Sequence, residues 1–173
     1  SSNYCFSNTI LVITSMNYIR FKKSKGKRHQ IILDEVSLVL FNKYTWSIVK
    51  QSNSHYLIGN IDGKMYRFHR LLFDNIDSTK FVDHINGNGL DNRLDNLRIC
   101  TPQQNRTNVP KLKGKSKYKG VRKSTKGKTW QAAIKKNHKW YYLGCFKTQQ
   151  EAAKAYNVAA IQLFGEFARL NEL

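Results

Sequence analysis

Four polar side chains between residues 83 and 105 have the types and spacing that phosphodiester hydrolysis needs. That reaction requires a base to activate water and a cation to hold the charge that develops on phosphorus and the leaving oxygen. His84 suits the base, because the pKa of an unperturbed imidazole lies near neutrality. Asp83 offers the cation a carboxylate and Asn105 offers it an amide oxygen. Asn96 can hydrogen-bond the far imidazole nitrogen or nearby backbone, which would fix the tautomer and orientation of the ring.

The surrounding sequence predicts a strand, a polar loop, a second strand and a short helix. Residues 80–84 and 97–100 are the two strands, and the loop between them is rich in Asn, Asp and Gly. Thr101 followed by Pro102 predicts the start of the helix that carries Asn105. The hairpin therefore brings the end of the first strand opposite a residue one turn into the helix. The other polar loop residues are expected to be turn formers: Asn86, Asn88, Asp91 and Asn92.

The whole chain is strongly basic. Its 173 residues include 30 Lys and Arg against 11 Asp and Glu, a formal net charge of +19. So many like charges repel one another in a compact chain, and binding of a polyanion relieves that repulsion. Nucleic acid is the expected partner, because each neutralised phosphate releases condensed counterions. Charge alone does not choose between DNA and RNA.

Other classes of protein find little support in the sequence. Apolar runs such as residues 36–41 are far shorter than the ~20 residues of a membrane span, and no signal peptide is evident, so we expect an intracellular protein that is not secreted. The cysteines form no CxxC pair, so we expect free thiols and no structural zinc: Cys5, Cys100 and Cys145. A monomer is the simplest expectation.

The chain is expected to be an α+β protein of two parts. Residues 1–110 form a strand-rich part that leads into the hairpin, with runs at 56–61 and 65–72 that flank the hairpin turn Asp62-Gly63. Residues 111–116 form a basic linker. From Lys111 onward the chain has 15 Lys and Arg against three Glu, so most of the charge excess lies in the smaller part.

Residues 117–173 predict a small three-stranded antiparallel sheet packed on one helix. The strands are expected at about 120–123, 130–136 and 139–146. Thr148 and Glu151 fit a capping box at the start of the helix, and Gly165 suits the position just beyond its end.

The stretch FVDHINGNGLDNRLDNLRICTPQQNRTN, residues 81–108, resembles the ββα-metal core of phage and intron-encoded HNH homing endonucleases, with Asn in place of the last His of the family's name. The resemblance implies that Asp83 and Asn105 bind one divalent ion. It implies that His84 is the general base and Asn96 its orienting partner. The upstream FHRLLF, residues 68–73, also matches, and there His69 or Arg70 is expected to contact phosphate. Oxygen ligands and waters suit Mg²⁺, and Mn²⁺ also binds such sites.

The C-terminal stretch resembles the DNA-binding domain of plant ethylene-response factors, through YKGVR, YLGCF and EAAKAY in residues 117–171. In that family the sheet lies in the major groove of double-stranded DNA, with the helix behind it. The resemblance implies DNA contacts from Lys119, Arg122, Ser124, Lys126, Lys135 and Tyr142, with Trp140 a weaker candidate.

Together these features predict a metal-dependent, site-directed DNA endonuclease of the homing type. The resemblance further implies 5′-phosphate and 3′-hydroxyl ends. Two alternatives remain open at this point: a non-catalytic DNA-binding regulator that keeps the hairpin as a scaffold, and an RNA-binding protein.

Overall fold

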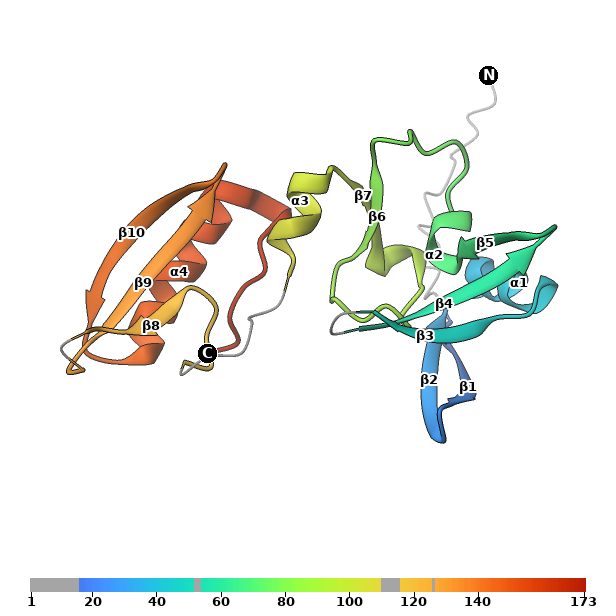
Figure 1. Cartoon of the computed structure of the whole chain (residues 1–173), viewed down its shortest axis with the longest axis horizontal. Coiled ribbons are helices and arrows are strands. Elements are labelled where there is room, and N and C mark those ends of the chain that lie inside the picture. Colours follow the sequence, from blue (N-terminus) through green and yellow to red (C-terminus); the bar gives the residue numbers. More distant parts are fainter. Residues whose placement is uncertain (1–15, 52–53, 110–115, 126) are drawn as a thin grey trace, which may run out of the picture.

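The chain folds into an α+β structure of small antiparallel sheets and short helices, as the sequence predicts (Figure 1). The computed structural model describes residues 16–51, 54–109, 116–125 and 127–173. Before residue 110 its elements are β1 (Tyr18–Ser24), β2 (Lys27–Leu33), α1 (Glu35–Lys43), β3 (Ser47–Gln51), β4 (Ser54–Ile61), β5 (Lys64–Arg67), α2 (Phe68–Leu71), β6 (Phe81–His84), η1 (Leu94–Asn96), β7 (Leu97–Cys100) and α3 (Pro102–Thr107). After residue 115 they are β8 (Val121–Lys123), β9 (Trp130–Lys136), β10 (Lys139–Phe146), α4 (Gln149–Phe164) and η2 (Gly165–Phe167).

The N-terminal core forms where the β1–β2 hairpin, the β3–β4–β5 sheet and helices α1 and α2 meet. Its most buried side chains, each at most 2% exposed, are Ile31, Leu33, Trp46, Leu57 and Phe68. The rings of Trp46 and Phe68 pack edge to face with centroids 4.8 Å apart, and the indole N–H donates to the Phe41 carbonyl over 3.0 Å. Burial of such side chains stabilises the fold by about 2 kcal/mol each.

The β4–β5 hairpin agrees with the sequence prediction at its turn and differs from it after Arg67. The turn Asp62-Gly63 joins β4 to β5 as predicted, with positive φ at both residues. The second run was expected to stay extended to residue 72, but β5 ends at Arg67 and Phe68–Leu71 forms one helical turn. Consecutive residues of a strand point to opposite faces. The helical turn instead lets the adjacent Phe68 and His69 both be buried.

The loop after β6 is tied to the N-terminal part by main-chain hydrogen bonds. The Ile32 N–H donates to the Leu90 carbonyl over 2.9 Å, and the Asn92 N–H donates back to the Ile32 carbonyl over 2.8 Å. The Leu94 N–H donates to the Asp34 carboxylate over 2.5 Å, across 60 positions of sequence. The loop conformation therefore depends on strand β2 and on the residue that caps α1.

Strands β6 and β7 pair antiparallel, with Asp83 opposite Arg98 and His84 opposite Leu97. Helix α3 follows directly, and its start is a capping box in which the Thr101 hydroxyl accepts from the Gln104 N–H. This strand, loop, strand and helix arrangement confirms the predicted ββα hairpin.

The C-terminal part is the sheet β10–β9–β8 with α4 packed on one face. Its buried side chains include Ala132, Ile134, Ala152, Tyr156 and Ala160. The predicted capping box is present, because the Glu151 N–H donates to the Thr148 hydroxyl while the Glu151 carboxylate accepts from the Thr148 N–H. Gly120 has φ +73°, and a Cβ there would lie 2.0 Å from the Tyr156 ring, so this position requires glycine.

The segment after α4 returns to the hairpin and contacts it directly. The Thr107 hydroxyl donates to the Phe167 carbonyl over 2.7 Å, and the Arg169 guanidinium donates to the Asn86 carbonyl over 2.9 Å. Gln103 of α3 also donates to the side chain of Asn137 in the β9–β10 turn. Helix α3 accordingly lies between the two groups of elements in Figure 1.

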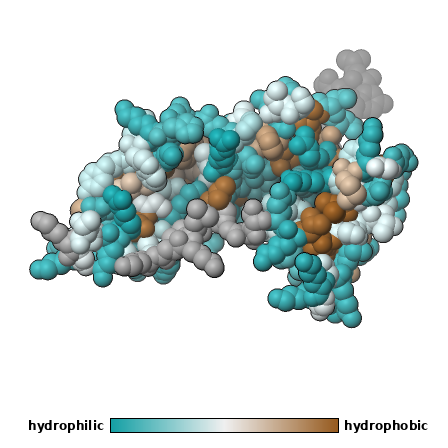
Figure 2. Space-filling view, viewed as in Figure 1, coloured by the Kyte–Doolittle hydropathy of each residue, from teal (hydrophilic) through white to brown (hydrophobic). Residues whose placement is uncertain are grey.

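The face of the molecule that Figure 2 shows is largely hydrophilic. In the view of Figure 2, hydrophobic residues form small separate patches among polar ones. Across the described ranges, none of the helices has the length and apolar character needed to cross a membrane.

Candidate active site

A pocket of about 490 Å³ brings together three of the four chemistry-bearing residues. Asp83 and His84 enter it from the end of β6, and Asn105 enters it from α3. His69 and Arg70, the two upstream residues, line the same pocket from α2. Asn96 does not line it. One cavity therefore gathers a carboxylate, two imidazoles, an amide and a guanidinium from three elements.

His84 is buried, 4% exposed, and its orientation is set by Asn92. The imidazole Nε2 lies 3.2 Å from the Asn92 side-chain oxygen. An amide oxygen only accepts, so Nε2 carries the proton and Nδ1 keeps its lone pair. Burial lowers the pKa of His84, and the hydrogen bond that the ring donates to Asn92 and the nearby Asp83 partly oppose that shift. The ring is thus held neutral in a single tautomer, the form that a base requires.

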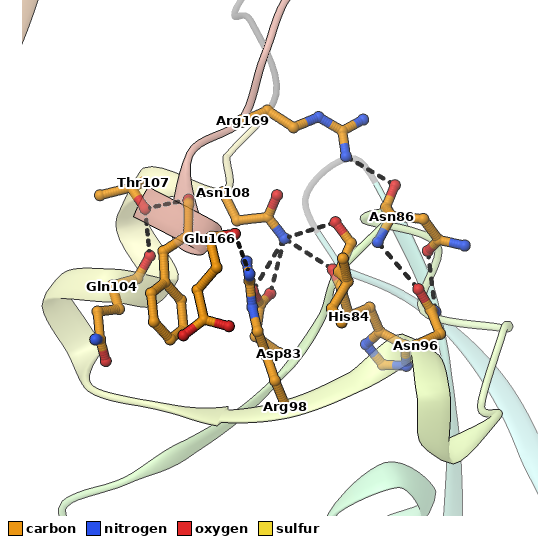
Figure 3. Close-up of polar contacts among 12 residues, drawn as sticks. Asp83, His84, Asn86, Asn96, Arg98, Gln104, Thr107, Asn108, Glu166 and Arg169 are labelled. Carbon is orange, nitrogen blue, oxygen red and sulfur yellow. Dashed lines mark hydrogen bonds and ion pairs between the residues drawn. The ribbon is translucent and has the colours of Figure 1, made fainter. Parts of the chain in front are cut away.

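Asn96 supports the loop rather than the imidazole. Its side-chain oxygen accepts from the Asn86 N–H over 3.1 Å (Figure 3). Its side-chain nitrogen donates to the Asp91 carbonyl over 2.7 Å. Asn96 was expected to bond either the His84 imidazole or nearby backbone. In the structure it bonds backbone, and the side chain that contacts the imidazole is Asn92. The expectation that Asn92 only forms a turn was therefore incomplete.

Asp83 is 8% exposed and is held by two donors. The Arg98 guanidinium donates to its Oδ2 over 2.9 and 3.1 Å, and the Asn108 amide donates to both carboxylate oxygens over 3.0 and 3.1 Å (Figure 3). Arg98 also donates to the Glu166 carbonyl over 2.5 Å. Asp83 Oδ1 accepts one hydrogen bond among the described residues, which leaves it a lone pair for a cation.

His69 packs directly against the candidate base. The rings of His69 and His84 lie edge to face with centroids 4.7 Å apart, and Tyr56 contacts both rings. Within the described part of the chain, His69 Nδ1 is buried without a hydrogen-bond partner. Burial, and then the neighbouring His84 and Arg67, lower the pKa of His69 to about 3. His69 is therefore a neutral wall of the site.

Few side chains of the pocket could bind a metal ion. Over residues 16–51, 54–109, 116–125 and 127–173, no three His, Cys, Asp or Glu side chains cluster as a metal site would. Asp83 and the amide of Asn105 are oxygen donors that line one pocket. Such a pair fits an ion that keeps most of its waters, as Mg²⁺ does.

The C-terminal sheet presents several expected DNA contacts on one face. Strand register places Arg122 opposite Gln131, Lys135 opposite Trp140, and Ala133 opposite Tyr142. These alternate with Ala132 and Ile134, which face α4 and are buried. The face away from α4 therefore carries Arg122, Lys135, Trp140 and Tyr142. Trp140 and Tyr142 are 65% and 61% exposed.

Two other expected contacts, Lys119 and Ser124, lie away from this face of the sheet strands. The Lys119 ammonium donates to the Thr107 and Val109 carbonyls over 2.6 and 2.8 Å, at the end of α3. Burial lowers its pKa to about 8. Ser124 lies in the turn after β8, where its N–H donates to the Thr129 carbonyl. Lys126 falls outside the described residues.

Sequence patterns missed three residues of the site: Asn92, Arg98 and Asn108. Arg98 had a weak signal, because a residue paired opposite Asp83 across a two-stranded hairpin faces the same side. Asn92 and Asn108 had none, since their partners are fixed only when the loop and the end of α3 fold back onto β6.

The comparisons with known proteins agree with this geometry. Residues 66–107 match the family model described as HNH endonuclease. An uncharacterized HNH endonuclease of Acanthamoeba polyphaga mimivirus is 35% identical over 175 residues, which span 96% of this chain and 88% of the relative. The chain belongs to the HNH endonuclease family, and it is a nuclease whose family membership implies DNA as the substrate.

Plant proteins match a shorter stretch. An AP2-like ethylene-responsive transcription factor of Arabidopsis thaliana is 46% identical over 55 residues, which are 31% of this chain and 16% of the relative. An ethylene-responsive transcription factor of Medicago truncatula is 45% identical over 62 residues, 35% of this chain and 26% of the relative. The similarity to these factors is confined to a fraction of each protein.

Proposed function

We propose that the chain is a metal-dependent, site-directed DNA endonuclease of the homing type. The observation that supports this best is the single pocket lined by Asp83, His84 and Asn105. The pocket lies on a ββα hairpin, and the HNH family match covers that hairpin.

His84 acts as the general base. Its Nδ1 takes a proton from the water that attacks phosphorus, and the bond to the 3′ oxygen breaks. The leaving oxygen takes a proton from solvent, which gives 5′-phosphate and 3′-hydroxyl ends. Asn92 holds the ring by accepting from Nε2, and Asn96 keeps the loop that carries Asn92 in place. The buried environment keeps the imidazole unprotonated near neutral pH.

Asp83 and Asn105 hold one divalent ion, for which Mg²⁺ fits best and Mn²⁺ also fits. When bound, the ion would stabilise the negative charge that develops on the phosphate and on the leaving oxygen. Arg98 and Asn108 fix the Asp83 carboxylate and leave Oδ1 a lone pair. His69 packs against the base, and Arg70 at the pocket wall contacts substrate phosphate.

The C-terminal part, residues 117–173, positions the hairpin on double-stranded DNA. Its outer sheet face carries Arg122, Lys135 and Tyr142, and the plant relatives are transcription factors by name. A lysine ammonium makes a single contact with a phosphate or a base, whereas an arginine guanidinium can make two parallel hydrogen bonds. A face that relies on lysine would therefore bind DNA tightly but discriminate weakly between bases. Residues 1–110 form the nuclease part, 111–116 the linker, and the protein acts as an intracellular monomer.

Cleavage of a supercoiled plasmid in Mg²⁺ tests the function. Wild-type protein is expected to relax or linearise the plasmid, and His84→Ala is expected to lose at least about a hundredfold in rate. His29→Ala is the matched control, because His29 lies on β2 outside the pocket.

Two outcomes would contradict this proposal. If His84→Ala cuts as fast as wild type, the base is misassigned. If the wild-type protein binds duplex DNA but never cuts with Mg²⁺ or Mn²⁺, the chain is a DNA-binding regulator that uses the hairpin as a scaffold.

A further inference from the structure

A second pocket, of about 570 Å³, lies where β9, α4 and α3 meet, with one side on the outer face of the C-terminal sheet. Lys135 and Trp140 line it from that face, where the Lys135 ammonium lies 5.8 Å from the Trp140 ring centroid. Gln103, Arg106 and Thr107 line it from α3. The pocket therefore joins the expected DNA-binding face to the helix that carries Asn105.

Arg106 belongs to both pockets. It is exposed, it follows Asn105 in α3, and it lines both the active-site pocket and the second pocket. The described side chains that line the two pockets include five further Lys and Arg but a single carboxylate, Asp83. The ammonium groups of Lys119 and Lys136 donate to backbone carbonyls, so the cations left to bind a ligand are Arg67, Arg70, Arg106 and Lys135. A lining with several cations and one carboxylate complements a phosphate backbone.

The two parts of the chain are docked through side chains as well as joined by the linker. Phe167, in the segment after α4, lies with its ring centroid 4.3 Å from the Arg98 guanidinium, and its carbonyl accepts from Thr107. Arg169 bonds the hairpin loop at Asn86. These contacts set the distance from the sheet face to the catalytic pocket.

We infer that one DNA duplex lies across both parts of the chain, with its backbone passing over Arg106, and that the cut falls at a fixed distance from the base pairs under the sheet. Arg106 binds the phosphate next to the reacting one. This inference rests on the proposed function, and it adds the route of the substrate and the origin of the cut position.

Binding without cleavage tests the route. A fluorescein-labelled 40-base-pair duplex is titrated with protein in EDTA at several salt concentrations. Arg106→Ala is expected to weaken binding about tenfold and to lower the slope of log K against log salt by about one. Arg106→Lys is expected to restore the slope. Arg20→Ala, an exposed arginine on β1 outside both pockets, is the matched control and is expected to leave the slope unchanged.

Cut mapping tests the fixed distance. Hydroxyl-radical footprints in EDTA locate the duplex on the protein, and ends produced in Mg²⁺ on the same duplex locate the cut. The wild-type protein is expected to cut at one offset from its footprint. The double variant Phe167→Ala, Arg169→Ala is expected to keep the footprint of the sheet but spread its cuts over several positions.

The outcomes separate the inference from the function. An unchanged salt slope in Arg106→Ala, or a single unchanged offset in the double variant, overturns the inference even when the enzyme cuts. If no cleavage occurs, the footprint still decides the route: protection over one continuous stretch that shortens in Arg106→Ala supports it, and protection confined to the sheet overturns it.

Discussion

The Arg98 guanidinium lies between the Asp83 carboxylate and the Glu166 carbonyl, so one side chain connects the proposed metal ligand with the segment that follows α4. The ion pair is mostly buried, with side-chain exposures of 11% for Arg98 and 9% for Asp83. Removing one partner of such a pair leaves an uncompensated charge in a low-dielectric site, which costs more than the pair itself contributes.

Arg98→Ala is therefore expected to lower the free energy of unfolding by about 3 kcal/mol, as measured by urea denaturation. The double variant Asp83→Asn, Arg98→Ala is expected to cost less than the two single variants together, because it removes both charges. Additive losses would show that the two side chains do not interact in solution.

Asn92→Ala is expected to lower kcat about tenfold to a hundredfold with little change in KM, because the imidazole loses the acceptor that fixes its tautomer. The hydrogen bond that the imidazole donates to Asn92 opposes the lowering of the His84 pKa by burial. Without it the pKa falls further, so the acid limb of the pH–rate profile should move to lower pH. Asn88→Ala, in the same loop but exposed, is the control. An unmoved acid limb would contradict the assignment of Asn92.

Stability should fall in acid because of His69. Its pKa is about 3 in the folded chain against a usual 6.5, so between these pH values the unfolded chain binds a proton that the folded chain does not. The folded chain is favoured fully above pH 6.5, where His69 is neutral in both the folded and the unfolded chain. Its free energy of unfolding then decreases as the pH falls toward 3. One such group contributes a slope of at most about 1.4 kcal/mol per pH unit.

In His69→Phe the free energy of unfolding is expected to depend less on pH than in wild type. Urea denaturation at about pH 7.5 and about pH 5 covers the upper part of the range in which His69 acts. Leu57→Ala is the control, since it removes a fully buried side chain without changing a titratable group. If His69→Phe and Leu57→Ala show the same pH dependence as wild type, another group causes the acid sensitivity.

Asn105→Ala is expected to raise the Mg²⁺ concentration at half-maximal cleavage by about tenfold or more, and Asn105→Asp is expected to recover binding through an added negative charge. Asn60→Ala, an exposed amide on β4 outside both pockets, provides the control. A loss of rate in Asn105→Ala that no concentration of Mg²⁺ restores, with half-saturation unchanged, would rule out a ligand role.

Local signals predicted the fold well, because their partners are near in sequence. The capping boxes at Thr101 and Thr148 and the turn at Asp62-Gly63 each involve residues within three or four positions. The helical turn at Phe68–Leu71 was missed, since it depends on burying two adjacent side chains in a core that other strands supply.

The candidate site was predictable in its residue types but not in its contacts. Asp83, His84 and Asn105 meet in one pocket because the hairpin is local. Asn92 was taken for a turn former because its place beside His84 depends on β2, far away in sequence. Lys119 was expected to face DNA, yet its ammonium satisfies the free carbonyls at the end of α3, a partner that the sheet sequence does not reveal.

The main-chain bonds between β2 and the catalytic loop make the working nuclease larger than its sequence signature. A fragment trimmed to residues 66–107, the stretch that the family model matches, would leave the Leu90 carbonyl and the Asn92 N–H without the partners that Ile32 supplies. Leu94 would lose the Asp34 carboxylate at the same time. Transplanting this chemistry into another scaffold would therefore require that the first hairpin be carried along with it.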